Sequence, residues 1–512
     1  MDQVRTRVFA ACQALARFFH YRRFIVEFPS ELILIILKSG CLSLSDLACL
    51  EITCTTLGKI KEQHHPTIKF RSLVDFAAFQ LFQSHPIYSF LNEDGKELLS
   101  GIIYNNWKQA LNFLSGYIQV RTGDNFTIVL KDSSVYISNC HSLGALLLED
   151  YLKHDQFTRI NFHQPISSYV DNIVSVSTKY KHIAFVTRSG DVFTCGDNSF
   201  GGCGHKTDSD INDNLILKPR LVEGALKGIP CKQVAVSYNF TVFLTRDGRV
   251  YTCGRNNHGQ LGHGDRVNRR TPTRVKSLVH CVVVHVTAGE TFTLALTKDG
   301  KLYSFGSGDD WCLGHGVKKN ELSPRLVEHF NICNIDSNIW DMNIVRVYAG
   351  VNHVVAIDSN GLVYTWGRGK VGQLCNGGSL DHTSPFTYHR REIYRYTPQI
   401  VKTLSSQIAI QASVSQFNTA ILMNDRCTVY VYGHRFPWEG YQLILEDSLK
   451  WDEHICHICQ VKTTGDLYQS VLVTDRGRIF GFGANNKGEE LRHGTTTYRR
   501  LFLPLTQLSL SG

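Results

Sequence analysis

The sequence predicts a mainly β protein, in which a seven-bladed β-propeller follows a small all-α N-terminal region. A pattern of apolar strand, tight turn and second apolar strand recurs seven times within residues 119–512. The glycines that end the second strand recur about every 50 to 66 residues, which suits a propeller with loops of variable length. With 43% hydrophobic residues and 41 glycines against 12 prolines, the chain can bury a large core and make many turns.

The clearest copy of the repeat runs from Phe240 to Gly254 and continues to Gly264. Its strands are joined by Asp247-Gly248, a pair that supplies the positive φ angles of a tight hairpin. Apolar residues fill both alternating sets of strand positions, as expected for sheets that are covered on both faces. The glycines that we take as the repeat signature are Gly196, Gly254, Gly262, Gly264, Gly306, Gly314, Gly316, Gly367, Gly433 and Gly483.

Two of the seven copies are weaker than the others. The copy that starts at Phe126 keeps the hairpin but has Asn139 where the others have glycine. The copy that starts at Asn418 keeps Gly433 but has residues 424–427 in place of the glycine turn. The count of seven blades depends on including both.

Residues 254–264 read Gly-x-Asn-x-x-Gly-Gln-Leu-Gly-His-Gly, and other copies repeat parts of this string in register. Over about residues 119 to 505 the chain therefore resembles the repeat family named for the regulator of chromosome condensation. The resemblance implies a propeller whose ring closes by combining strands from both chain ends. The segment Leu501 to Leu505 is then expected to complete the blade that begins near Val120.

Residues 1–118 differ from the rest because their apolar residues follow a helical period. The segment at about residues 28–58 resembles an F-box, in which a proline opens the first of two apolar helices. In that family the motif recruits a ubiquitin-ligase adaptor, and the adaptor-binding residues implied here are Phe28, Pro29, Leu32 and Ile36. The alternative is a helical cap that binds no adaptor. Together with the propeller, this segment resembles a plant subgroup of the repeat family.

The formal net charge is +9, and two basic runs stand between repeat signatures. They are either solvated loops or a surface for an acidic protein, with nucleic acid as a less favoured partner. No apolar run reaches the roughly eighteen residues of a membrane span, and arginines interrupt the region where a secretion signal would stand. We therefore expect an intracellular protein, in the nucleus or the cytoplasm, that binds no membrane. The candidate basic partner surface consists of Arg266, Arg269, Arg270, Arg390 and Arg391.

Residues that could carry chemistry have simpler structural explanations. Cys456 and Cys459 have the spacing of half a zinc site, but the sequence nearby offers no second half. The recurring histidines occupy one position of the repeat and therefore share a structural cause: His205, His263, His315 and His493. The sequence contains no phosphate loop, zinc-protease motif or nucleophile elbow. We expect no catalytic residue, no cofactor and no metal, and hence no enzyme.

The sequence favours a non-enzymatic protein-interaction scaffold that binds a protein partner on a propeller face. With a working F-box it would be a substrate receptor of an SCF-type ubiquitin ligase. One alternative that the resemblance implies is a guanine-nucleotide exchange factor for a Ran-type small GTPase. Another is a chromatin-associated or ultraviolet-response regulator related to a plant photoreceptor branch, although that branch's Gly-Trp-Arg-His-Thr signature is absent from this chain.

Overall fold

The chain divides into two compact units, Met1–Tyr117 and Ile118–Gly512. The structure is a computed structural model, and all the residues that it describes lie in the second unit. The described residues are 119–123, 126–131, 134–138, 158–160, 173–180, 182–187, 189–206, 215–330, 343–375, 394–425, 427–433, 441–444, 455–462, 468–474, 479–483 and 499–504.

The helical region expected at residues 1–118 lies outside this described part. The same holds for the four F-box-like residues Phe28, Pro29, Leu32 and Ile36 and for Arg390 and Arg391 of the basic surface. Within the described residues the structure is mainly β and contains no α-helix. No described helix has the length and apolarity needed to cross a membrane.

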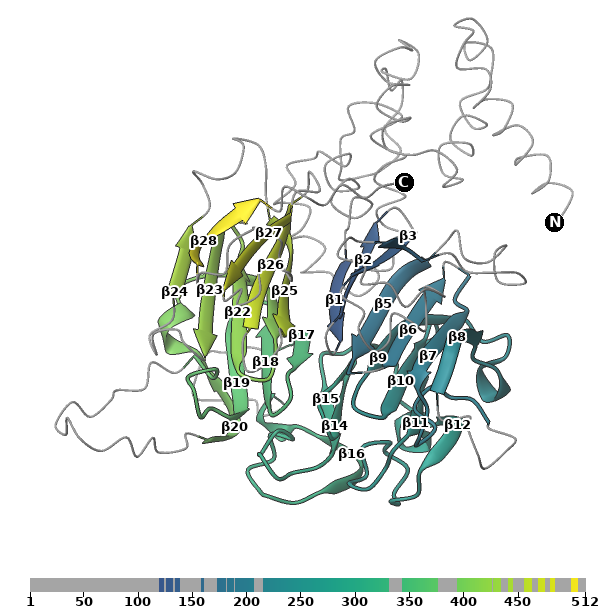
Figure 1. The fold of residues 1–512 in the computed structure, drawn as a ribbon. Helices are drawn as coiled ribbons and strands as arrows, with labels where there is room; N and C mark the ends of the chain where they lie inside the picture. Colours follow the sequence, from purple (N-terminus) through teal and green to yellow (C-terminus); the bar gives the residue numbers. More distant parts are fainter. Residues whose placement is uncertain are drawn as a thin grey trace, which may run out of the picture. The chain divides into compact units, whose positions relative to one another are not determined.

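The described residues form seven four-stranded sheets, and in each sheet neighbouring strands run antiparallel (Figure 1). Each sheet is built from four strands that are consecutive in the chain. The first two sheets consist of β1 (Gln119–Gly123), β2 (Phe126–Lys131), β3 (Ser134–Ser138), β4 (Thr158–Arg159), β5 (Ile173–Lys179), β6 (His182–Thr187), β7 (Val192–Asp197) and β8 (Leu215–Leu221).

The next three sheets contain the best-formed repeats. Their strands are β9 (Cys231–Val236), β10 (Phe240–Thr245), β11 (Val250–Gly254), β12 (Arg269–Arg274), β13 (Val283–Ala288), β14 (Phe292–Thr297), β15 (Leu302–Gly306), β16 (Glu321–Leu326), β17 (Ile344–Ala349), β18 (His353–Asp358), β19 (Val363–Arg368) and β20 (Tyr394–Ile400). The last two sheets consist of β21 (Ala409–Val414), β22 (Asn418–Met423), β23 (Thr428–Gly433), β24 (Tyr441–Ile444), β25 (Ile455–Lys462), β26 (Tyr468–Thr474), β27 (Ile479–Gly483) and β28 (Arg499–Pro504).

Among the described residues, four short 3-10 helices follow outer strands, and each buries one apolar side chain in the cluster between its sheet and the next. They are η2 (Gly224–Leu226), η3 (Lys276–Leu278), η4 (Glu328–Phe330) and η5 (Lys402–Leu404). Both weak copies of the repeat form hairpins, one from β2 and β3 and the other from β22 and β23. The hairpin pattern alone was therefore enough to locate these strands.

The hairpin between β10 and β11 shows why the repeat sequence folds as it does. Gly248 has a φ angle of 84°, and its N–H donates to the carbonyl of Thr245 at 3.0 Å. All six residues of β10 are buried. Phe240 and Val242 pack in a cluster shared with the fourth sheet, whereas Phe243 packs in a cluster shared with the second sheet. The prediction that these strands are covered on both faces is confirmed.

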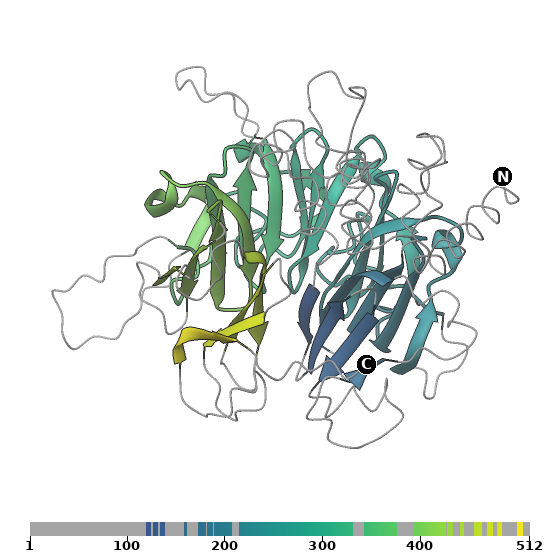
Figure 2. The same cartoon turned by 90° about the horizontal axis from the view of Figure 1, so that it is seen from above.

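The described core consists of six clusters, and each cluster joins two sheets that are consecutive in the chain. Figure 2 shows the sheets following one another in chain order, from blue through green to yellow. The largest cluster joins the fourth and fifth sheets and contains Phe292, Tyr364 and Trp366, each at most 1% exposed. No sheet can bury both of its faces alone, so stability resides in the contacts between sheets.

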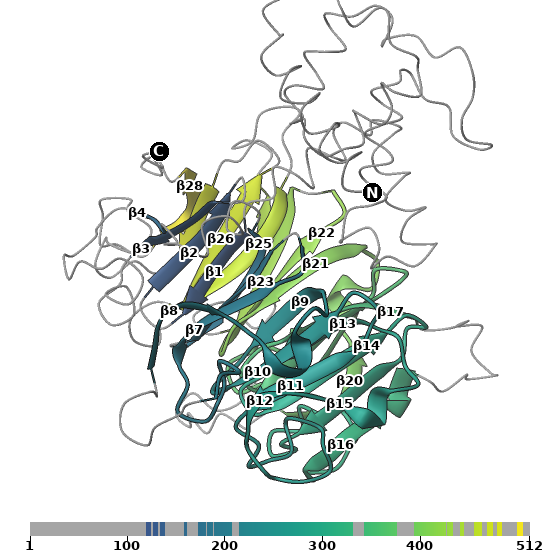
Figure 3. The same ribbon diagram turned by 90° about the vertical axis from the view of Figure 1, so that its right-hand side faces the viewer.

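The expected exchange of strands between the chain ends is wrong. Leu503 of β28 pairs with Gly481 of β27, so β28 completes the last sheet and not the first. The fourth place of the first sheet is filled by β4, whose Arg159 pairs with Tyr136. The first and last sheets instead meet through contacts between β1 and β25 (Figure 3).

Candidate interaction surface

In a four-stranded antiparallel sheet of consecutive strands, two loops lie at the same end. These are the loop from the first to the second strand and the loop from the third to the fourth. We call this end the loop face. It carries the turns that follow the signature glycines, and three of them are described in full or in large part: residues 197–206, 255–268 and 307–320. Because the loops stand on rigid sheets, the loop face can hold side chains in fixed positions.

A hydroxyl and a histidine hold each of these three turns in place. The hydroxyl of Thr252 donates to the carbonyl of Leu261 at 2.8 Å and lies 2.9 Å from Nε2 of His263. Since the hydroxyl has one hydrogen, which the carbonyl receives, Nε2 must be the donor to the hydroxyl oxygen. The same arrangement joins Thr194 to His205 and Ser304 to His315, each at 2.9 Å.

These histidines are neutral at physiological pH. Burial lowers the pKa of His205, His263 and His315 to about 4. A neutral ring whose Nε2 hydrogen is already donated to a hydroxyl within its own turn is poorly suited to catalysis. This geometry agrees with the structural explanation of His205, His263 and His315, whereas His493 lies outside the described residues.

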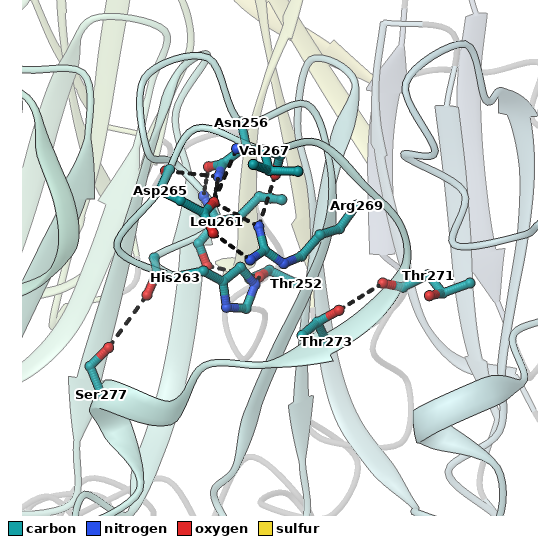
Figure 4. A network of polar contacts seen from close by, with 11 residues as sticks. Thr252, Asn256, Leu261, His263, Asp265, Val267, Arg269, Thr271, Thr273 and Ser277 are labelled. Atoms are coloured by element: carbon teal, nitrogen blue, oxygen red, sulfur yellow. Dashed lines mark hydrogen bonds and ion pairs between the residues drawn. The ribbon is translucent and has the colours of Figure 1, made fainter.

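A second network fixes the turn after β11 (Figure 4). Asn256 is fully buried, and its Nδ2 donates at 3.0 Å to both the carbonyl and Oδ1 of Asp265. Two guanidinium nitrogens of Arg269 donate to the two carboxylate oxygens of Asp265 at 2.9 and 2.8 Å. The hydrogen bonds from Arg269 hold the pKa of Asp265 well below its usual range. Arg269 is therefore committed to the shape of its own loop.

The loop carries three arginines of the proposed basic surface, and they differ in exposure. Arg266 and Arg270 are exposed and flank the Asp265–Arg269 ion pair. The guanidinium of Arg255, in the same turn, lies 5.1 Å from the ring centroid of Phe200 on the preceding turn, so this loop carries a further cationic group. The structure thus brings Arg266, Arg269 and Arg270 together but gives Arg269 a structural role.

The Gly-His-Gly turns also connect neighbouring sheets. A Cβ placed on Gly204 would lie 3.3 Å from Cδ of Pro272, which belongs to the outer strand of the next sheet. Gly262 stands in the same relation to Pro324 at 3.2 Å, and Gly314 to Pro398 at 3.4 Å. At each boundary a glycine of one repeat packs on a proline of the next.

Side-chain hydrogen bonds also cross the boundaries between consecutive sheets. The side-chain hydroxyls of Thr241, Thr293 and Thr419 donate to turn carbonyls of the preceding sheet at 2.7 to 2.8 Å. At the fourth sheet's boundary with the fifth, Val354 stands in the place of threonine. There Trp366, which pairs with Val354 across the strands, donates its indole N–H to the carbonyl of Cys312 at 2.8 Å.

The zinc-like pair Cys456 and Cys459 lies within β25, where the sequence predicts a strand. Among the described residues, no group of three or more His, Cys, Asp or Glu side chains could hold a metal ion. Six of the eight cysteines whose side chains are described are buried. Burial raises the pKa of Cys231 to about 12, as expected for cysteines that serve as apolar packing residues.

Comparison with known families accounts for this repeat. The Regulator of chromosome condensation (RCC1) repeat matches residues 189–244, 247–296, 299–357 and 360–422. A second description of the same repeat matches residues 173–201, 231–260, 283–310 and 344–373. Within residues 173–422 the chain is therefore similar to regulator of chromosome condensation repeats.

Curated proteins that are similar to this chain include probable ubiquitin-protein ligases and an ultraviolet-B receptor. The probable E3 ubiquitin-protein ligase HERC4 of Homo sapiens is 33% identical over 236 residues, which are 46% of this chain and 21% of HERC4. The chain thus spans about a fifth of the length of that relative. The ultraviolet-B receptor UVR8 of Arabidopsis thaliana is 28% identical over 374 residues, which are 71% of this chain and 75% of UVR8.

The fold of the regulator of chromosome condensation repeats is also found in solved structures. Yeast RCC1 (Prp20), solved with Kap60 bound, superposes with a TM-score of 0.53 at 18% identity. The match covers 74% of this chain and 83% of the yeast protein. At this identity the likeness concerns the fold.

The signature glycines lie where this repeat makes its sharpest turns. From Gly196 to Gly433 they all have positive φ angles, between 73° and 120°, and Gly483 ends β27. Sequence reasoning missed Trp311, which has a φ of 55° in the register that glycine holds in other repeats. Aligning the turns of the regulator of chromosome condensation repeats would have singled it out.

Proposed function

We propose that this protein is a non-enzymatic scaffold that binds a protein partner on its loop face, in the nucleus or the cytoplasm. The observation that carries the proposal is the division of roles on the loop after β11. Asn256, Asp265 and Arg269 fix the loop, while Arg266 and Arg270 stay exposed on it. A rigid loop with exposed guanidinium groups suits recognition of an acidic protein surface.

The scaffold that we propose is a closed seven-bladed propeller formed by residues 119–512, preceded by an all-α region at residues 1–118. Its support is the order of contacts between the first strands of the sheets. Contacts join β1 to β5, β5 to β9, β9 to β13, β13 to β17, β17 to β21, β21 to β25 and β25 to β1. A cyclic series of this kind is expected when every sheet is one blade of a ring.

A comparison of arginine variants tests the basic surface. Arg266→Glu with Arg270→Glu should remove most copurifying partner protein from the full chain and lower the melting temperature less than Arg269→Ala does. Arg269→Ala is the matched control and should act in the opposite sense, lowering stability more than binding. Partner recovery that is identical for the parent and the double variant would contradict the assignment of this surface.

We further propose that the segment at residues 28–58 joins the scaffold to an SCF-type ubiquitin ligase through Phe28, Pro29, Leu32 and Ile36. Support comes from the helical spacing of these apolar residues and from relatives such as HERC4, which is named as a probable ubiquitin ligase. This chain spans only about a fifth of HERC4, so the proposed link to a ubiquitin ligase rests mainly on the resemblance of residues 28–58 to an F-box.

Replacing Leu32 and Ile36 by aspartate in the full chain tests this link. Capture of purified adaptor should be lost, while the unfolding curve of the propeller stays the same because its core is separate. A partner-neutral helical cap predicts no adaptor binding by the parent chain. A well-folded parent that fails to bind adaptor therefore excludes the ligase role.

Nucleotide exchange on a Ran-type GTPase is the second candidate. It is favoured by the fold shared with Prp20p of Saccharomyces cerevisiae, whose structure was described together with its binding to Gsp1p and histones. The same likeness supports a chromatin-associated role. Release of labelled GDP from a purified Ran-type GTPase should accelerate on adding the full chain if the exchange activity exists, and an unchanged rate excludes it.

A further inference from the structure

Trp311 adopts a backbone conformation that glycine adopts in the other described repeats. Its N–H donates to the carbonyl three residues earlier, that of Gly308, at 3.1 Å. The equivalent N–H groups, which bond in the same way, belong to Gly201, Gly259 and Gly372, with φ angles of 81°, 86° and 92°. Trp311 has a φ of 55°, a left-handed conformation that is unfavourable for a residue with a Cβ atom. Such strain is characteristic of functional positions.

The surroundings of Trp311 differ from those of the glycines. At Gly201 a Cβ would lie 2.3 Å from Cα of Arg270, and at Gly259 it would lie 2.6 Å from Cα of Leu322. In those repeats the outer strand of the next sheet closes directly on the glycine. At Trp311 the indole instead packs on two tyrosines of β20, with centroid distances of 4.8 Å to both Tyr394 and Tyr396.

Trp311 and Tyr394 are half-buried, and the aromatic group reaches solvent chiefly through Tyr396. Tyr396 is 52% exposed, and Val317, which lies in the same turn as Trp311, is 47% exposed. The ammonium group of Lys318 stands 5.6 Å from the centroid of the Trp311 ring. We call Trp311, Lys318, Tyr394 and Tyr396 the Trp311 cluster. Trp and Tyr are enriched among the side chains that anchor protein interfaces.

The charge around the Trp311 cluster favours an anionic partner. Asp310 is half-buried, and its carboxylate accepts from Nδ2 of Asn352 at 2.6 Å and lies 4.0 Å from a guanidinium nitrogen of Arg368. Its charge is therefore compensated internally. The exposed charges that remain in this turn are Lys318 and Lys319 against Asp309. The excess is positive and lies next to the aromatic rings.

We propose that the Trp311 cluster is a docking site for an acidic linear segment of a partner protein. An apolar or aromatic side chain of that segment packs on the Trp311 indole, and its carboxylates pair with Lys318 and Lys319. The site deepens the proposed scaffold function and rests on it. Because the equivalent described turns carry glycine, the cluster directs the partner to one position on the loop face.

Selection of a random-peptide phage library on the full chain tests the docking site. The enriched peptides should be rich in Asp and Glu and contain an aromatic or large apolar residue. They should bind Trp311→Gly about 30-fold more weakly or worse, as for the loss of an interface anchor. The variant's melting temperature should equal or exceed that of the parent, because glycine accepts the left-handed φ. Leu217→Ala, at an exposed position on β8, is the control and should bind as the parent does.

A second variant keeps the proposal falsifiable if Trp311→Gly is destabilised. Lys318→Glu with Lys319→Glu should fold like the parent and lose the same peptides. Peptides that lack acidic residues, or that bind both variants like the parent, overturn the proposal, as does their displacement by a single-stranded DNA oligonucleotide. Binding that is lost only in Arg266→Glu with Arg270→Glu rejects the Trp311 site but leaves the scaffold function intact.

Discussion

Trp366 shows how two residues change together to keep one hydrogen bond. Threonine supplies the bond between sheets at Thr241, Thr293 and Thr419, but valine at position 354 has no hydroxyl. The indole N–H of Trp366 reaches the carbonyl of Cys312 instead, and its ring is fully buried. The pair therefore keeps a buried carbonyl satisfied, which matters more to stability than the net strength of the bond.

Trp366→Phe should destabilise the protein by about 1 to 3 kcal/mol, because the carbonyl of Cys312 is left without this donor. Adding Val354→Thr should restore part of the loss, since the pair then matches Thr293 and Phe305 at the preceding boundary. Urea unfolding of both variants and of Val354→Thr alone measures the coupling. If the two substitutions act additively, the compensation does not exist.

Gly254 combines a positive φ of 110° with close neighbours. A Cβ there would lie 2.3 Å from the carbonyl oxygen of Asn239 and 2.5 Å from Cα of Phe240. Gly224 has a φ of 70° but no heavy atom within 4 Å of such a Cβ. We expect Gly254→Ala to cost about 3 kcal/mol and Gly224→Ala about 1 kcal/mol. Equal shifts in melting temperature would mean that backbone strain alone, and not crowding, fixes glycine at position 254.

At the scale of the element, the repeat turn behaves as a unit with neutral histidines at its base. Its polar groups are satisfied internally by a hydroxyl, a histidine and backbone carbonyls. The strands of the hairpin then contribute mainly to the core, and the repeats differ in the residues of their loops. This division explains why the turns keep their shape while Arg266 on one turn and Trp311 on another give them different surfaces.

Acid should weaken the fold before the carboxylates titrate. Burial lowers the pKa of His182, His205 and His263 to about 4, below the 6.5 of the unfolded chain. Between these values the unfolded state binds more protons, so their contribution is complete above pH 6.5 and is lost as the pH falls toward 4. The free energy of unfolding should drop by about 2 kcal/mol or more from pH 7 to pH 5.

Denaturant unfolding at several pH values checks this dependence. His205→Gln keeps a side-chain N–H for Thr194 but cannot titrate, so its stability should fall less steeply over the same range. If the free energy of unfolding of the parent protein is constant from pH 7 to pH 5, these rings take up protons in the folded state as readily as in the unfolded state.

For the whole molecule, the way the first and last sheets meet decides how the protein tolerates loss of its C-terminal strand. β28 pairs only with β27 among the described strands, and β1 meets the last sheet through β25. A chain that ends at residue 498 should therefore fold, with a melting temperature lower by several degrees. Small-angle scattering should give a radius of gyration close to that of the parent. Global unfolding of the shortened chain would indicate that β28 closes the ring.

The sequence was a good guide to local structure and a poorer guide to connections. Asp247-Gly248 and the strands around it formed the predicted hairpin because turn geometry and strand burial depend on neighbouring residues. The segment near Leu503 was assigned to the wrong sheet because nothing in its local pattern states which edge it pairs with. Arg269 was counted as a partner residue for the same reason, since its pairing with Asp265 depends on the folded loop.

By itself, the sequence determined the repeat, its strands and its tight turns, because the spacing of apolar residues and glycines encodes them locally. Only the tertiary structure decided which polar side chains form hydrogen bonds and ion pairs within the fold and which remain exposed. Arg269 and Asp310 are tied into their surroundings, whereas Arg266 and Tyr396 stand in solvent. The distances between side chains and their burial depend on contacts between residues that are far apart in the chain. The position of a binding surface therefore follows from tertiary packing and not from the local sequence pattern.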